Sequence, residues 1–137
     1  MTSERYQRGA ARLAQVDPTL ETAIQKGLAP IAPDFARFMV EFGYGDVLAR
    51  PGLDKRKRQL VTIGALTALG HSPDQLRGHI AGALNVGVEP QEIVEAIMQC
   101  ALYAGFPAAT NAMRVAKQVF AERGVSPLEP DTHDGVA

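Results

Sequence analysis

Ten consecutive residues without a charge, Leu60 to Leu69, constrain the fold of this chain more than any other stretch. The helix-breaking segment Gly70 to Pro73 follows them, and a second amphipathic run then carries His79. Leu76 and Ile80 flank this histidine at helical spacing. The pattern predicts a helical hairpin with an apolar first arm and a histidine at the margin of the buried face of its second arm.

Apolar residues recur at helical spacing along most of the chain, and no segment shows the sustained alternation that is typical of strands. Asp54 is expected to cap the central helix, and residues 72–75 (Ser-Pro-Asp-Gln) form the pattern of a capping box. The sequence therefore predicts an all-α chain of six or seven helices, at about 4–15, 18–27, 34–42, 54–69, 73–86, 90–104 and 107–123, with a broken or loosened stretch at 43–50.

Phe35, Phe38, Met39 and Phe42 share one face of the third predicted helix. Large apolar side chains at this spacing belong to a core far more often than to a cofactor site. We therefore expect this face to be buried.

The length of 137 residues fits one domain, which we place at 1–124, followed by a flexible, Pro-rich and acidic tail at 125–137. The net charge of -1 disfavours partners such as nucleic acid or an anionic membrane surface. A single cysteine, the absence of a signal-peptide pattern and the absence of a run of about 20 apolar residues favour a cytoplasmic protein.

Two predicted helices, 59–69 and 93–104, are apolar nearly all round. A small monomer has little interior in which to bury two such helices. We expect a homo-oligomer whose subunits cover them, and the alternative is ordinary burial within a compact bundle.

The titratable residues offer few candidates for chemistry. The three histidines lack metal-ligand spacing, so no metal site is expected, and Cys100 lies in an apolar helix that favours an inert thiol. His79 is the best candidate for proton transfer, although a core histidine with a satisfied ring is the alternative. Asp46 and Arg50 form a second candidate pair beside Tyr44, and a simple i,i+4 ion pair is the alternative there.

Three stretches, FGYGDVLARPGLDKRKRQLVTIGALTALG, QLRGHIAGALNVGV and EIVEAIMQCALYAGFPAATNA, together resemble the carboxymuconolactone decarboxylase family. The resemblance covers about residues 35–122. It implies an all-α fold of the carboxymuconolactone decarboxylase or alkylhydroperoxidase-like type and an obligate homo-oligomer, a homo-trimer or homo-hexamer.

The resemblance also separates two branches of the family. His79 matches the histidine of the alkylhydroperoxidase-like branch, but Ser72 and Gln75 occupy its two cysteine positions and Gln59 stands where a glutamate is usual. Thiol peroxidase chemistry is therefore disfavoured, because no thiolate pair is present. The decarboxylase branch is closer, although Tyr44-Gly45-Asp46 replaces its usual Trp-Gly-Glu.

What the resemblance implies is a cofactor-independent decarboxylase of a small anionic substrate, a carboxylated lactone such as 4-carboxymuconolactone, in aromatic catabolism. Arg50 would hold a carboxylate or the lactone oxygen, His79 would donate a proton or stabilise the enolate oxygen, and Asp46 would orient His79 or shuttle the proton. Further substrate-binding positions are Tyr44, His71 and Arg58. The alternatives are an isomerase, dehydratase or cyclase of a small enolisable substrate, and a non-catalytic small-ligand binder.

Overall fold

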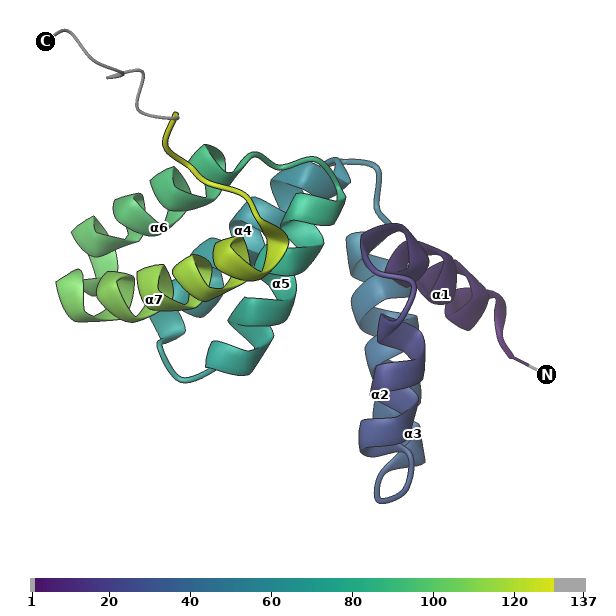
Figure 1. The fold of residues 1–137 in the computed structure, drawn as a ribbon. Coiled ribbons are helices and arrows are strands. Elements are labelled where there is room, and N and C mark those ends of the chain that lie inside the picture. Colours follow the sequence, from purple (N-terminus) through teal and green to yellow (C-terminus); the bar gives the residue numbers. More distant parts are fainter. Residues whose placement is uncertain (1, 130–137) are drawn as a thin grey trace, which may run out of the picture. The chain divides into compact units, whose positions relative to one another are not determined.

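The computed structural model describes residues 2–129, and its regular elements are all helical, with no strand among these residues. The all-α prediction is therefore confirmed (Figure 1). In chain order the elements are α1 (Glu4–Val16), α2 (Leu20–Leu28), α3 (Pro33–Phe38), the π-helix η1 (Met39–Leu48), α4 (Lys55–Leu69), α5 (Pro73–Asn85), α6 (Pro90–Ala104) and α7 (Phe106–Arg123).

The chain forms two compact units, one ending at Arg58 and the other beginning at Gln59, within the first turns of α4. In the first unit, α1 packs along η1 and α2 packs against α3. Its interior is small, because short helices bury few side chains. The fully or nearly fully buried apolar residues of this unit are Leu13, Val16, Ala36 and Val40.

The stretch predicted to be broken or loosened at 43–50 corresponds mostly to the π-helix η1, which begins earlier, at Met39, continues directly from α3 and ends at Leu48. Gly43 and Gly45 lie within it, and glycine accepts departures from regular helical geometry at low steric cost. π-helical segments are rare and often lie at functional positions. This one carries Tyr44 and Asp46, two of the residues that the sequence predicted for the site.

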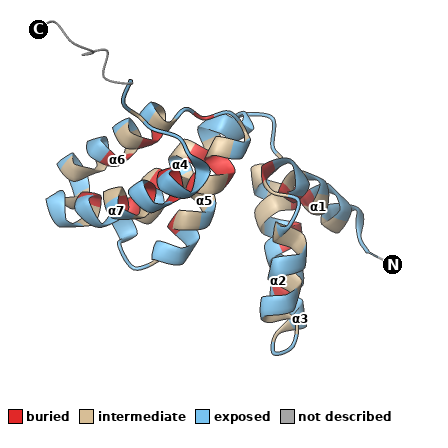
Figure 2. Ribbon diagram, viewed as in Figure 1, coloured by how far each residue is buried: buried red, intermediate tan, exposed pale blue. Residues whose placement is uncertain are grey.

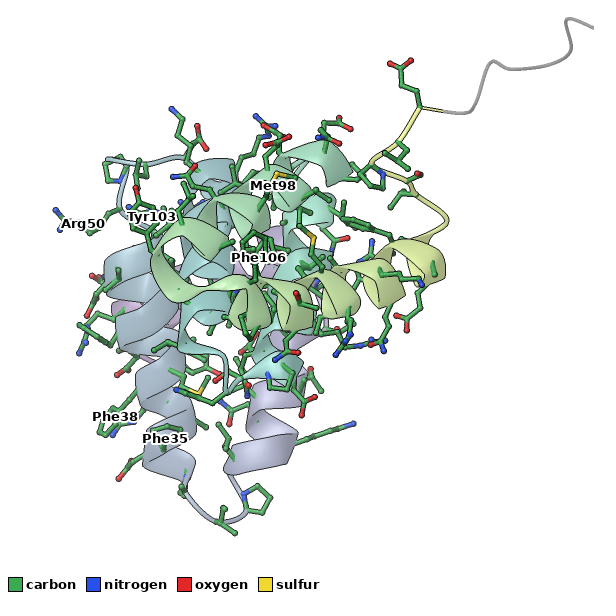
Figure 3. The ribbon with its side chains drawn as sticks, turned by 90° about the vertical axis from the view of Figure 1, so that its left-hand side faces the viewer. Phe35, Phe38, Arg50, Met98, Tyr103 and Phe106 are labelled. Carbon is green, nitrogen blue, oxygen red and sulfur yellow. The ribbon has the colours of Figure 1, made fainter. Side chains whose placement is uncertain are left out.

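The prediction that the aromatic face of residues 35–42 is buried was wrong for the single chain. Phe35, Phe38 and Phe42 are 55%, 53% and 61% exposed, and Met39 is 36% exposed. Figure 3 shows Phe35 and Phe38 pointing away from the ribbon. The helical period was right, but the buried residues of this segment, Ala36, Val40 and Glu41, lie on the other side of the helix.

The second unit has the larger core, built from α4 to α7, with α7 packed against both α5 and α6. Figure 2 shows its buried residues along the facing sides of these helices. The core members are Ile63, Leu76, Ile80, Ala83, Val88, Ile93, Ile97, Ala109, Ala112, Ala116, Val119 and Phe120.

Helix boundaries in this region follow from local chemistry. The Asp54 carboxylate accepts a hydrogen bond from the Lys57 backbone N–H at 2.9 Å, so the predicted cap of α4 is confirmed. The predicted capping box at Ser72 was wrong, because the Ser72 side chain makes no cap bond and its Oγ lies 3.0 Å from His71 Nδ1. The box lies instead at α6, where the Glu92 carboxylate accepts from the Glu89 backbone N–H at 2.8 Å.

Thr67 offers a stability test of the α4 core face. Its side chain is 1% exposed, and its hydroxyl oxygen has no hydrogen-bond partner among the described residues. Because burying an unpaired hydroxyl costs free energy, Thr67→Val is expected to raise the free energy of unfolding by about 1 kcal/mol. Urea denaturation followed by circular dichroism measures this, and a destabilised variant would show that the hydroxyl is paired in solution.

No helix within residues 2–129 is both long enough and apolar enough to span a bilayer. Of the tail predicted at 125–137, residues 125–129 are described, and Val125 donates its backbone N–H to the Phe120 carbonyl at 3.0 Å. His133, which the sequence places in this tail, lies outside the described residues.

Candidate active site

The site residues that the sequence predicted fall in both units, so each group is described within its own unit. Tyr44, Asp46, Arg50 and Arg58 belong to the first unit. His71 and His79 belong to the second. The convergence of Asp46 and Arg50 with His79 stays a prediction.

His79 lies in the middle of α5, three residues after the buried Leu76 and one before the buried Ile80. Its half-buried position at the margin of the core confirms the placement expected from the sequence. Burial lowers the pKa of the imidazole below its ordinary value, because a low-dielectric surrounding disfavours the charged ring. The ring is therefore neutral at pH 7.

The partner of the His79 ring is Gln59, whose Oε1 lies 3.1 Å from His79 Nδ1. Gln59 is 5% exposed and belongs to a buried stripe of α4 that continues at Ile63 and Thr67. Sequence reasoning did not assign this role to Gln59. The signal was available, because residues 59, 63 and 67 are spaced by four and so share one face of a helix.

Asp46 is held by two arginines of α1. Arg5 donates to the carboxylate from Nε at 3.0 Å and from Nη2 at 2.5 Å, and Arg8 donates from Nη2 at 3.1 Å. Hydrogen bonding and attraction from these guanidinium groups hold the pKa of Asp46 below its usual range. Asp46 is therefore an anion at pH 7, and its ion-pair partners are Arg5 and Arg8, where the i,i+4 alternative had proposed Arg50.

Glu41 is a further acid of η1 that the sequence did not single out. It is 6% exposed, and its carboxylate accepts a 2.5 Å hydrogen bond from the Ser3 hydroxyl. Arg5 Nη1 lies 3.9 Å from the same carboxylate. The side chains of Arg5 and Ser3 thus tie α1 to η1 through two carboxylates.

Arg50 follows η1 and points away from the ribbon (Figure 3). Its backbone carbonyl accepts a 3.0 Å hydrogen bond from Arg58 Nη2, and Arg58 Nε donates to the Leu53 carbonyl at 3.2 Å. Arg58 therefore braces the loop at 50–53. The exposed guanidinium of Arg50 is suited to bind a carboxylate.

The remaining candidates divide between shielded and exposed positions. Tyr44 is half-buried on η1, and burial raises the pKa of its phenol, which stays protonated at neutral pH. His71 is exposed beside Ser72. Cys100 is half-buried, its thiol donates to the Gly64 carbonyl at 3.5 Å, and burial raises its pKa. A thiol protonated at neutral pH is a poor nucleophile.

No group of three or more His, Cys, Asp or Glu side chains in residues 2–129 is arranged to hold a metal ion. The side chains of the candidate site can act as acids, bases and hydrogen-bonding groups. A neutral imidazole, an ionised carboxylate, an exposed guanidinium and a protonated phenol are the groups available.

Comparison with known proteins finds relatives of this chain. The chain is 46% identical over 94 residues to the 4-carboxymuconolactone decarboxylase of Acinetobacter baylyi, which covers 69% of each chain. It is 34% identical over 120 residues to an uncharacterized 15.0 kDa protein of Paracoccus denitrificans, covering 87% of this chain and 90% of the relative.

A third relative, the nitrosuccinic acid decarboxylase of Metarhizium robertsii, is 34% identical over 100 residues, covering 72% of this chain and 68% of the relative. The model of the carboxymuconolactone decarboxylase family matches residues 33–118, which include every predicted site residue. The chain belongs to the carboxymuconolactone decarboxylase family.

Proposed function

We propose that the protein is a cofactor-independent decarboxylase of a small carboxylated lactone such as 4-carboxymuconolactone. The observation that carries this proposal is the 46% identity to a relative named for that activity. The relative named nitrosuccinic acid decarboxylase also supports loss of CO2 as the shared reaction. Aromatic catabolism in the cytoplasm remains the setting proposed from the sequence.

Both named substrates carry a carboxylate that can leave as CO2 while an electron-withdrawing group accepts the remaining electron pair. In the lactone this acceptor is the conjugated carbonyl, and in the nitro acid it is the nitro group. The C–C bond breaks, its electron pair stays on the substrate, and a carbon atom then takes one proton. The protein must bind the anion, stabilise the delocalised charge and deliver that proton.

The residues of the candidate site match these tasks by type. The exposed Arg50 guanidinium would bind a substrate carboxylate, as proposed from the sequence, with Tyr44, Arg58 and His71 as further binding positions. His79 would supply the proton. Asp46 would influence His79 only through the negative charge of its carboxylate or through a proton relay, because Arg5 and Arg8 already bind the carboxylate oxygens.

The assay uses purified protein, metal-free buffer and 4-carboxymuconolactone, with nitrosuccinate as a second substrate. Trapped CO2 and the mass of the product are measured together. Release of one CO2 per substrate above the background rate supports the proposal. A product of unchanged mass, or one that has lost water, would instead support the isomerase or dehydratase alternative, and binding without turnover would support the ligand-binding alternative.

We further propose a homo-oligomer, a homo-trimer or homo-hexamer, because α4 and α6 leave apolar side chains uncovered in the single chain. A groove of about 590 Å³ runs between these two helices, and Gly64, Ala96 and Cys100 line it. Tyr103, which also lines the groove, is 84% exposed (Figure 3). Leu102 on α6 and Phe106 at the start of α7 are 79% and 78% exposed.

Large exposed apolar surfaces mark interaction sites in soluble proteins. Sedimentation equilibrium is expected to give three or six times the chain mass. A monomer that persists at micromolar concentration would contradict the oligomer and would leave these side chains exposed to water.

A further inference from the structure

Gln59 is a buried amide that contacts the ring of His79. Its side chain is 5% exposed at the start of the second unit, and its Oε1 faces His79 Nδ1 at 3.1 Å. The contact joins α4 to α5 across twenty residues of sequence. Ile63, one turn further along α4, is fully buried, so the position of Gln59 is fixed by the packing of the same helix face.

An amide oxygen accepts hydrogen bonds and cannot donate them. In a neutral imidazole one ring nitrogen carries the hydrogen and the other carries a lone pair. The hydrogen must therefore lie on Nδ1 where it meets Gln59 Oε1, and the lone pair lies on Nε2 at the other side of the ring. A glutamate at this position would also accept from Nδ1, but its charge would stabilise the protonated ring.

We propose that Gln59 is a positioning residue whose amide oxygen holds His79 as the Nδ1–H tautomer, so that Nε2 meets the substrate without a proton. The inference rests on the proposed decarboxylase function for its chemical meaning. In this tautomer Nε2 carries no proton that His79 could donate directly to the substrate. Nε2 takes a proton from solvent water and passes it to the carbon that loses CO2, and one proton is consumed per turnover.

This assignment predicts how the rate depends on pH. The protonated ring is the donor, so kcat falls as the pH rises through the pKa of His79 in the complex. Gln59→Glu places a carboxylate on Nδ1–H and stabilises the protonated ring. We expect the falling limb of the pH profile to move about one pH unit or more to the alkaline side.

The tautomer is measured directly by nitrogen-15 NMR of the imidazole rings, without any turnover. His79 signals are assigned by their loss in His79→Gln. In the wild-type protein Nε2 is expected at a shift typical of an unprotonated ring nitrogen, and Nδ1 at a shift typical of N–H. In Gln59→Met, which keeps the length of the side chain but removes the acceptor, this preference is expected to be lost.

Thr67→Val is the matched control. Thr67 lies two turns further along the same buried stripe, and its replacement by valine also removes a polar group. It should leave the His79 nitrogen shifts unchanged. A protonated Nε2 in the wild-type protein, or identical shifts in Gln59→Met, would overturn the proposal.

The same experiments separate the two proposals. An unprotonated Nε2 together with background CO2 release would uphold the role of Gln59 and reject the decarboxylase. Turnover of the lactone together with a protonated Nε2 would uphold the decarboxylase and reject the tautomer.

Discussion

Replacement of His79 by alanine is expected to lower kcat for CO2 release by about 100-fold to 10,000-fold, the range for loss of a general acid or base. His79 carries the imidazole to which the proposal assigns proton transfer, and burial holds this ring neutral until a proton is taken up. Its removal leaves water as the proton source. Steady-state kinetics with 4-carboxymuconolactone measures the loss.

The control is Gln75→Ala, which changes an exposed side chain one turn earlier on the same helix. It should retain the wild-type rate, so that an effect of His79→Ala is not an effect of disturbing α5. Circular dichroism and urea denaturation verify that both variants fold. A His79→Ala enzyme within threefold of the wild-type kcat would remove His79 from the mechanism.

The sequence predicted the helices well because most of their signals are local. Gly87 and Gly105 have positive φ values of 88° and 90°, and they lie in the two gaps that the sequence predicted between helices 73–86, 90–104 and 107–123. Asp54 caps α4 through a bond that spans three residues. Such interactions involve residues that are close in sequence, so they can be predicted without knowledge of the tertiary structure.

The sequence failed where the outcome depended on distant partners. Phe35 and Phe38 have the spacing of a core face, but no helix of their own unit covers them, so they are exposed. Asp46 and Arg50 have the spacing of an ion pair, but Asp46 is instead bound by Arg5 and Arg8, which lie about forty residues earlier in the sequence. A charge pattern along one helix cannot show which arginine is nearest in space.

The candidate site shows the same division. His79 could be chosen from its position beside Leu76 and Ile80, and its half-buried state was expected. Gln59 required knowledge of which side of α4 faces His79, which the predicted hairpin alone does not specify. Once helices are paired, its place on the stripe shared with Ile63 makes it the polar group that faces the ring.

Substitution of Gly9 by alanine is expected to have the largest effect on stability. Gly9 is buried where α1 lies against η1. An added Cβ would collide with the Val40 carbonyl oxygen and would lie 3.1 Å from the Gly45 backbone nitrogen. On η1, a Cβ added to Gly45 would in turn collide with the Arg5 carbonyl oxygen. The two glycines therefore permit a close approach of two backbones.

Backbone atoms inside two packed helices cannot move aside as a flexible side chain can. Overpacking of this kind typically costs about 1–3 kcal/mol and sometimes more, while alanine regains only about 1 kcal/mol of helix propensity. We therefore expect Gly9→Ala to lower the free energy of unfolding by about 2 kcal/mol in urea denaturation. The shift of α1 should also weaken the hold of Arg5 and Arg8 on Asp46.

Gly27→Ala gives the opposite expectation and serves as the matched control. Gly27 lies near the end of α2 in the same unit, and no atom lies within 4 Å of an added Cβ. With propensity acting alone, the variant should be more stable than the wild-type protein by about 0.5–1 kcal/mol. The opposite signs matter more than either magnitude, because equal behaviour of the two variants would mean that α1 and η1 do not meet at Gly9 and Gly45 in solution.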